Sequence, residues 1–281
     1  METLTHPSDA AEWAACQRRS GKRIAFVPTM GALHEGHLAL MHAARKHGDV
    51  VAASIFVNPL QFNDPADLAR YPRHPEEDCR LLSGVGVDMV LMPEGGGLFH
   101  DFSPRQYALD GLDTLLEGAS RPGHFQGVVN VVERLFHFVR PDVALFGEKD
   151  RQQLAVIRSA AQAERWPIEI IGHPIVRNAG GLALSSRNQR LSAVERQQAL
   201  VLYKALSAVQ QSAFHRSVEQ ALEAGRHEIA QEPAVVPDYL TLVDPATFRP
   251  LRSWEGVHEA IALVAVQVGP VRLIDNMAVH R

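Results

Sequence analysis

Short apolar runs alternate with helical segments along the first 175 residues, and this alternation restricts the fold more than any other feature of the chain. The runs are bounded by proline or turn residues, as expected of strands buried on both faces of a parallel sheet. They lie at 24–27, 49–57, 87–92, 143–146 and 168–171, and the helical segments at 8–20, 38–46, 76–83, 126–139 and 152–163. The alternation predicts an α/β fold with a Rossmann-like, doubly wound parallel sheet, in which ligands bind at the carboxyl ends of the strands.

The last third of the chain has a different pattern, with two helical segments followed by three strand-like runs. The helical segments are 192–210 and 217–231, and the strand-like runs are 239–243, 260–268 and 271–274. Helices followed by consecutive strands predict a smaller α+β domain with an antiparallel sheet. We therefore expect a Rossmann-like domain over residues 1–175 and an α+β domain over residues 176–281.

Composition excludes several functional classes. A net charge of −4 over 281 residues gives no reason to expect a surface for nucleic acid or anionic membranes. Two cysteines, Cys16 and Cys79, cannot form a disulfide framework or a four-thiolate zinc site. No apolar stretch approaches the roughly 20 residues of a membrane-spanning helix, and the N-terminus lacks the apolar core of a signal peptide. The composition predicts a cytoplasmic enzyme or binding protein with no nucleic-acid or membrane partner.

Residues 28–37, Pro-Thr-Met-Gly-Ala-Leu-His-Glu-Gly-His, connect the first buried strand to a helix. His34 and His37 are three residues apart, so they share one face at the positive end of that helix. Main-chain N–H groups and imidazoles at such a position favour binding of nucleotide phosphates. A zinc site would need a third ligand, and the other histidines of the 14 in the chain show no ligand spacing. A purely structural role for the pair is the alternative.

Two further polar clusters, at 58–62 and 147–153, also follow predicted strands. Because the carboxyl ends of parallel strands meet at one edge of a sheet, the three clusters together indicate a ligand site more strongly than any one of them. The glycine-rich stretch 94–97 lies outside any strand-to-helix turn, so we interpret it as a flexible loop.

Taken in order, these segments resemble the pantothenate synthetase (pantoate–β-alanine ligase) family. The matching segments are P-T-M-G-A-L-H-E-G-H, S-I-F-V-N-P-L-Q-F, S-R-P-G-H-F, F-G-E-K-D and L-S-S-R-N, followed by Asp238-Tyr239, Val243-Asp244-Pro245 and Leu273-Ile274-Asp275-Asn276-Met277. The H-x-G-H element is shared with class I aminoacyl-tRNA synthetases and nucleotidyltransferases and alone indicates an adenylating enzyme. The set of five segments in this order is specific to the one family, and the resemblance covers nearly the whole chain.

The resemblance implies a two-step ligation. ATP and (R)-pantoate give pantoyl adenylate and pyrophosphate, and β-alanine then attacks the adenylate to give pantothenate and AMP. The resemblance also implies Mg²⁺ as a cofactor, a homodimer formed by the N-terminal domains, and a C-terminal domain that acts as a lid. Such a reaction must neutralise the charge that develops at the α-phosphate and on the leaving pyrophosphate, for which helix N-termini, cationic side chains and magnesium are suited.

The resemblance also implies roles for individual residues. His34, His37 and Lys149 are the expected catalytic contacts to the phosphates, with His37 as the proton donor. The expected ATP contacts are Met30, Gly31, Ala32, Leu33, His34, Glu35, Gly36, His37, Gly147, Glu148, Lys149, Asp150, Val176, Leu184, Ser185, Ser186 and Arg187. The expected pantoate contacts are Gln61, Gln153 and Asn58, and Gln61 is also expected near β-alanine. Amides suit a substrate with hydroxyls and a carboxylate because they offer both a donor and an acceptor.

Other positions stay open at this point. Arg121 and His124 are expected near the site without a defined role. The acidic run 76–78 fits either a solvated helix start or assistance to magnesium, so no metal ligand is assigned. The chain departs from the family pattern at Arg151, where an aromatic residue is usual, and in the loop 95–103, which lacks the usual Tyr-Pro pair.

Two rival functions are weighed against the ligase. A nucleotidyltransferase that acts on a phosphate ester would present a basic clamp rather than the neutral amides of Gln61 and Gln153. A non-catalytic nucleotide sensor on the same fold would be expected to lack His34, His37 or Lys149, all of which are present.

Overall fold

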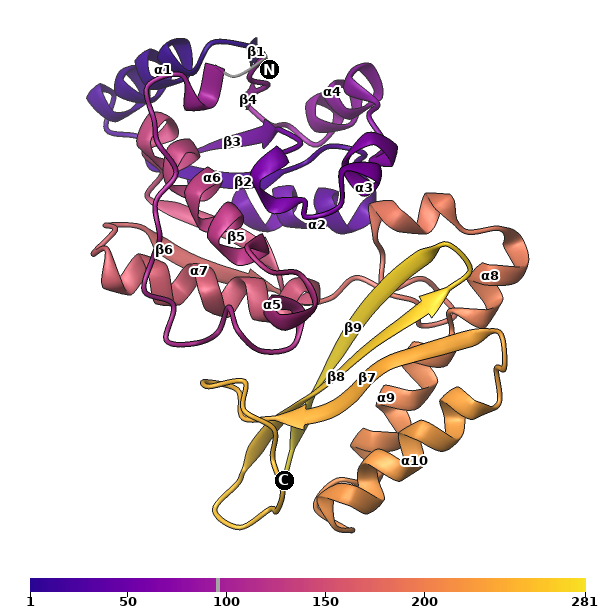
Figure 1. The fold of residues 1–281 in the computed structure, drawn as a ribbon. Helices are drawn as coiled ribbons and strands as arrows, with labels where there is room; N and C mark the ends of the chain where they lie inside the picture. The colour runs from indigo at the N-terminus through magenta and orange to yellow at the C-terminus, as the bar shows by residue number, and fades with distance from the viewer. Residues whose placement is uncertain (95–96) are drawn as a thin grey trace. The chain divides into compact units, whose positions relative to one another are not determined.

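The computed structural model describes residues 1–94 and 97–281 (Figure 1). Gly95 and Gly96, which belong to the stretch that we interpret as a flexible loop, lie outside the described residues. By its internal contacts the chain divides into two compact units. The N-terminal unit comprises Met1–Glu148 and Gln152–Pro174, and the C-terminal unit comprises Lys149–Arg151 and Ile175–Arg281.

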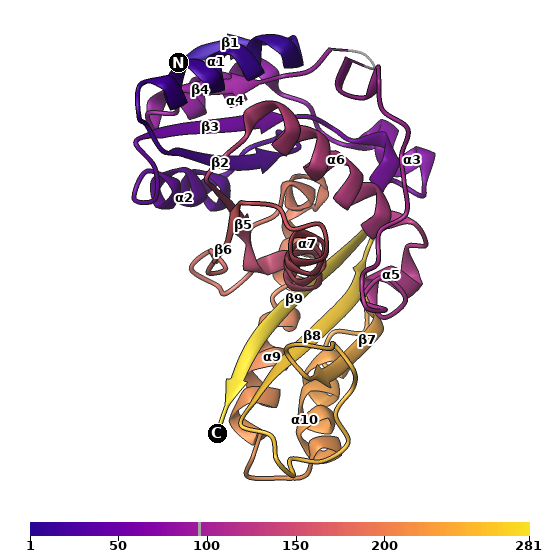
Figure 2. The same cartoon turned by 90° about the vertical axis from the view of Figure 1, so that its left-hand side faces the viewer.

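The N-terminal unit contains a six-stranded sheet in the order β1-β4-β3-β2-β5-β6, and each neighbouring pair is parallel (Figures 1 and 2). The strands are β1 (Glu2–Leu4), β2 (Ile24–Thr29), β3 (Val50–Ile55), β4 (Met89–Leu91), β5 (Val143–Gly147) and β6 (Glu169–His173). The predicted parallel sheet is confirmed, and β1 is an additional edge strand. The strand order reverses between β2 and β5, so the segments that follow these two strands flank the switch point where ligands bind in such sheets.

Helices cover both faces of this sheet, as a doubly wound fold requires. The helices between the strands of this sheet are α1 (Pro7–Arg19), α2 (Glu35–Ala44), α3 (Pro65–Arg70), α4 (Pro75–Gly84), α5 (Glu117–Ser120), α6 (His124–Val139) and α7 (Arg151–Ala163), with short 3-10 turns η1 (Pro59–Gln61), η2 (Gly97–Phe99) and η3 (Glu148–Asp150). Successive strand residues point to opposite faces. Phe26 therefore packs with side chains of α1, α6 and α7, whereas Val27 packs with side chains of α2 and α4.

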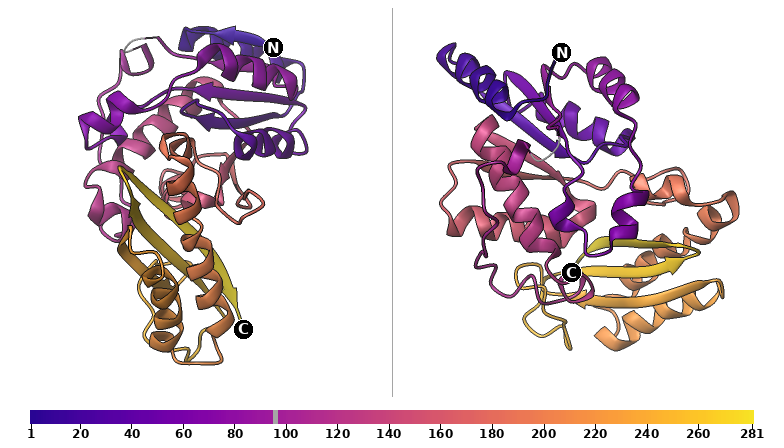
Figure 3. Two further views of the ribbon diagram at one scale, coloured as in Figure 1. Left: turned by 90° about the vertical axis from the view of Figure 1, so that its right-hand side faces the viewer. Right: turned by 45° about the horizontal axis from the view of Figure 1, so that its top comes forward.

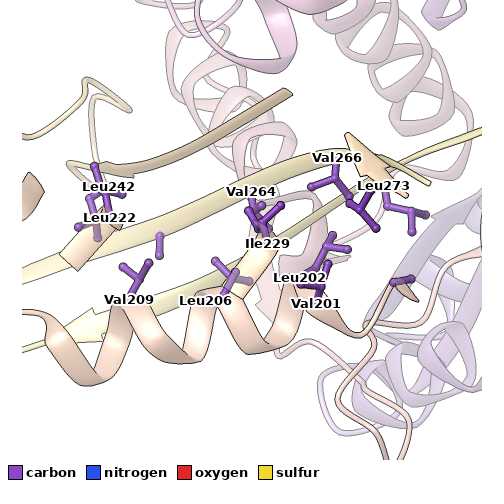
Figure 4. Close-up of a cluster of buried hydrophobic side chains, with 14 of the residues drawn as sticks. Val201, Leu202, Leu206, Val209, Leu222, Ile229, Leu242, Val264, Val266 and Leu273 are labelled. Atoms are coloured by element: carbon purple, nitrogen blue, oxygen red, sulfur yellow. The ribbon is translucent and has the colours of Figure 1, made fainter. Parts of the chain in front are cut away.

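The C-terminal unit is a three-stranded antiparallel sheet with two long helices (Figure 3). Its elements are η4 (Ser186–Arg190), α8 (Ala193–Gln198), α9 (Val201–Ser212), α10 (Val218–Ala230), β7 (Val235–Val243), β8 (Glu259–Val268) and β9 (Val271–His280). Apolar residues of α9 and α10, such as Leu206 and Leu222, pack against strand residues such as Val264 (Figure 4). The predicted antiparallel α+β unit is confirmed.

The single helix expected at 192–210 is two helices in the structure, α8 and α9. Ala199 and Leu200 lie between them and keep α-helical backbone angles. The main-chain hydrogen bonds tighten there to an i→i−3 spacing, from Leu200 N to Gln197 O and from Leu202 N to Ala199 O. Among residues 1–94 and 97–281, no helix is long and apolar enough to cross a membrane.

Candidate functional site

A buried carboxylate shapes the turn between β2 and α2. The side chain of Asp78, on α4, accepts one main-chain hydrogen bond with each oxygen, from Ala32 N at 2.9 Å and from Leu33 N at 2.8 Å. Asp78 is only 1% exposed. Gly31 has a φ of +76°, and a Cβ at this position would lie 2.8 Å from Asp78 Oδ2. The turn therefore requires glycine at 31 and a small acceptor at 78.

The acidic run 76–78 divides into solvated and buried side chains. Glu76 and Glu77 are exposed, and a hydrogen bond from Arg80 lowers the pKa of Glu77. Asp78 instead lies on the same helix face as buried Leu82, four residues on, and holds the turn. The sequence reasoning missed this role, although the spacing to Leu82 could have indicated an inward-facing Asp78.

The two histidines at the start of α2 form a reciprocal cap. His34 is the N-cap residue, and its Nδ1 accepts a hydrogen bond from Gly36 N at 3.1 Å. His37 Nδ1 accepts from His34 N at 3.4 Å, and the two ring centroids lie 4.1 Å apart. A main-chain N–H only donates, so each Nδ1 is unprotonated and each neutral ring carries its proton on Nε2. Each imidazole of the pair therefore has an N–H at Nε2 and belongs to the positive end of a helix.

Asn58 and Gln61, after β3, are joined to the turn after β2. Asn58 is buried; its Oδ1 accepts from Leu60 N at 3.1 Å, and its Nδ2 donates to Gln61 Oε1 at 3.1 Å and to Gly127 O at 3.0 Å. Gln61 Nε2 contacts Met30 Sδ at 2.9 Å. These contacts place two predicted pantoate residues and one predicted ATP residue in a single group.

Arg121 and His124 hold the main chain of Gln61. The carbonyl of Gln61 accepts from His124 Nδ1 at 2.8 Å and from Arg121 Nη2 at 3.3 Å. Because the carbonyl only accepts, His124 carries its proton on Nδ1, and its Nε2 can accept from Arg121 Nη1 at 3.1 Å. A Cβ at Gly127 would lie 2.1 Å from Leu60 O, so glycine permits the close approach of α6 to η1. The two side chains thus have a defined structural contact to a predicted substrate residue.

The adjacent glutamines of α7 differ in their surroundings. Gln152 is 4% exposed; its amide donates to Leu112 O at 2.7 Å and to Leu115 O at 2.8 Å, and it accepts from Glu117 N at 3.2 Å. Gln152 therefore holds the loop before α5. Gln153 is only partly buried, and its assignment to pantoate stays a prediction.

Of the other predicted ATP contacts, Gly147 and Glu148 belong to the N-terminal unit and the rest to the C-terminal unit. Val176 and Leu184 lie opposite each other, with Leu184 N donating to Val176 O at 2.9 Å. The chain then enters η4, where Ser185 Oγ accepts from Arg187 N at 3.3 Å as a helix cap. Lys149 also belongs to this unit, and its Nζ lies 3.7 Å from Asp150 Oδ1.

Comparison with known proteins identifies close relatives. A family model described as pantoate–β-alanine ligase matches residues 2–278. The chain is 48% identical to a pantothenate synthetase of Koribacter versatilis over 264 residues, which cover 93% of this chain and 90% of the relative. The crystal structure of pantothenate synthetase from Thermus thermophilus is similar over 100% of both chains, with a TM-score of 0.93 and 45% identity. The pantoate–β-alanine ligase of Francisella tularensis, complexed with β-γ ATP and β-alanine, has a TM-score of 0.81 and 31% identity, over 99% of this chain and 97% of that chain.

Proposed function

The chain belongs to the pantoate–β-alanine ligase family, and from this membership we propose that it joins (R)-pantoate to β-alanine with ATP, through a pantoyl adenylate. One observation carries the assignment of chemistry to residues: the side chains of His34 and His37 cap the start of α2 reciprocally through Nδ1. That position follows β2, at the switch point of the sheet. Two neutral donors beside a helix N-terminus suit an anionic phosphate chain.

In the first step a carboxylate oxygen of pantoate attacks the α-phosphorus of ATP. The bond between this phosphorus and the bridging oxygen of pyrophosphate breaks, and the electron pair leaves with pyrophosphate. The proposed role of the N–H groups of His34 and His37 and of the ammonium of Lys149 is to stabilise the charge that develops on the phosphate oxygens. Ser185 and Arg187 are proposed to bind the pyrophosphate, with the guanidinium suited to bidentate contact.

In the second step the amine of β-alanine attacks the acyl carbon of the adenylate. The bond from that carbon to the phosphate oxygen breaks, AMP leaves, and the new amide nitrogen releases a proton. Gln61 is proposed to contact both pantoate and β-alanine, since its side chain is fixed by Asn58 and its main chain by His124. A fixed amide holds the two reactants in line, which is the main requirement of such a transfer.

Magnesium enters this proposal with ATP. In the described part of the chain, no group of three or more His, Cys, Asp or Glu side chains is placed to hold a metal ion. We propose that a magnesium ion is carried by the triphosphate, because Mg²⁺ in such enzymes keeps several waters and binds substrate phosphates. When bound there, the ion would neutralise phosphate charge, and no protein ligand is assigned to it.

Three further expectations stay predictions: the homodimer, the role of the C-terminal unit as a lid, and the cytoplasmic location.

The products of a complete reaction test the proposed function. Purified protein supplied with ATP, Mg²⁺, pantoate and β-alanine should form AMP and pantothenate in equal amounts, with pyrophosphate as the third product. Formation of ADP would contradict an adenylate intermediate. Nucleotide transfer to a phosphate ester, without any pantothenate, would favour the rival nucleotidyltransferase.

We expect Gln153→Ala to weaken the use of pantoate much more than the binding of ATP. Loss of a hydrogen bond to a charged substrate weakens binding by about 1.5–3 kcal/mol, which corresponds to a rise of roughly 10- to 150-fold in KM for pantoate. Separate titrations of pantoate and of ATP measure the two effects. The neighbouring Gln152→Ala is the matched control, because it removes buried hydrogen bonds to Leu112 and Leu115 and should lower the melting temperature instead. An equal rise in both KM values for Gln153→Ala would refute the pantoate assignment.

A further inference from the structure

The segment Leu273–Met277 has no role in the chemistry described above, yet two of its residues are buried polar groups. Asp275 is 3% exposed and Asn276 is 4% exposed. Both lie on β9, which is an edge strand of the antiparallel sheet. Polar side chains this deeply buried are normally satisfied by specific partners, so their hydrogen bonds show what they hold.

The side chain of Asn276 holds the main chain of Lys149. Asn276 Nδ2 donates to the carbonyl oxygen of Lys149 at 2.9 Å, across a sequence separation of 127 residues. The main chain of Asn276 is itself fixed, because its N–H donates to Asp275 Oδ1 at 2.7 Å and its carbonyl accepts from Arg177 Nη2 at 3.0 Å. The anchor of the Lys149 main chain is therefore rigid.

The side chain of Asp275 fixes the hairpin that carries other predicted ATP contacts. It forms a two-point ion pair with Arg177, with Nη1–Oδ2 at 2.5 Å and Nη2–Oδ1 at 3.0 Å. Arg177 Nη1 also donates to Gly181 O at 3.0 Å, and its guanidinium lies 5.0 Å from the ring centre of Tyr203. A Cβ at Gly181 would lie 2.2 Å from the Tyr203 ring, so the hairpin closes tightly on that ring.

We propose that Asp275 and Asn276 form one positioning centre for the ATP contacts of the C-terminal unit. Asn276 positions Lys149, and Asp275 acts through Arg177 on the hairpin from Val176 to Leu184, which leads directly into Ser185–Arg187. This inference rests on the proposed function, because it assigns a purpose to contacts around residues given a phosphate role there. Lysine has a long flexible side chain, so fixing its main chain limits where the ammonium can reach. A small misplacement of such a group lowers the rate of reaction strongly.

The test is Asn276→Ala in the full-length protein. Pyrophosphate release that depends on pantoate, measured without β-alanine, reports adenylate formation. We expect kcat for this half-reaction to fall roughly 10- to 100-fold, with KM for pantoate unchanged and the melting temperature shifted by only a few degrees. Asn276→Asp keeps the shape of the side chain but removes the donor, and it should give the same loss. Full activity in both variants would overturn the proposal.

A double-mutant cycle separates positioning from general damage. If Asn276 acts through Lys149, Asn276→Ala should cause no further loss of rate in a Lys149→Ala background. Independent, multiplicative losses would refute the positioning role. Gln210→Ala is the matched control, because Gln210 Nε2 donates to Ala278 O on the same strand at 2.9 Å and should be dispensable for kcat.

The rates of the two single variants distinguish failure of the proposed phosphate contact from failure of the positioning role. If Lys149→Ala alone kept the full rate, the phosphate contact itself would be wrong. If Lys149→Ala were inactive and Asn276→Ala fully active, the phosphate contact would stand and only the positioning role would fail.

Discussion

Replacing Lys149 by alanine is expected to slow the formation of pantoyl adenylate by at least about 100-fold while leaving the protein folded. Removing one donor that stabilises developing charge lowers kcat by about 10²–10³-fold in other enzymes. The Lys149 side chain is 18% exposed and its Nζ lies 3.7 Å from the Asp150 carboxylate. A largely shielded cation acts more strongly on phosphate oxygens than one in bulk water.

Pantoate-dependent pyrophosphate release in a single turnover measures this effect without interference from the second step. Lys149→Arg keeps the charge but changes its shape and reach, so an intermediate rate is expected. Lys204→Ala is the control, because Lys204 is an exposed lysine on α9 of the same unit and should keep the wild-type rate. A Lys149→Ala variant with the wild-type rate would show that Lys149 does not contact the reacting phosphates.

Hydrophobic pattern was sufficient to predict the architecture. The predicted parallel strands are β2 to β6 in the structure. Each is a short apolar run that can be recognised in the local sequence without reference to distant residues. Strand β1 was not predictable in this way. It has only three residues, Glu2–Leu4, and exists as a strand because it pairs with Met89–Leu91 of β4. Such a strand is defined by its partner rather than by its own sequence.

In the candidate site, too, some features follow from local sequence and others depend on distant residues. Local spacing placed His34 and His37 at a helix start, and the structure adds that they cap it through Nδ1. Local pattern could have indicated that Asp78 faces inward, but it could not show which distant segments Asp78 and Asn276 hold. Asp78 bonds to a turn 46 residues away, and Asn276 to a carbonyl 127 residues away. Buried polar contacts between distant segments produce no periodic pattern in the sequence, so the partners can be identified only from the structure.

The second large effect is expected for Asp78→Asn. The amide keeps the size of the carboxylate but replaces one acceptor by an NH₂ group that faces the main-chain N–H of Ala32 or Leu33. A buried donor left without its acceptor costs about 1–3 kcal/mol, so urea unfolding should show a free energy of unfolding lower by about this amount. The turn includes Gly31 and Ala32 with φ of +76° and +50°. We expect it to relax when the hydrogen bonds to the Asp78 carboxylate are lost.

Relaxation of this turn changes the start of α2 and so displaces the Nε2–H groups of His34 and His37. We therefore expect kcat for adenylate formation to fall by roughly 10- to 100-fold at saturating ATP, under conditions where circular dichroism shows the variant folded. Glu77→Gln is the matched control, since it makes the same carboxylate-to-amide change one residue earlier, on an exposed side chain paired with Arg80. Loss of stability with an unchanged rate per folded molecule would show that Asp78 supports the fold alone. A fall in rate confined to Asp78→Asn would show that the buried carboxylate sets the geometry of the histidine pair.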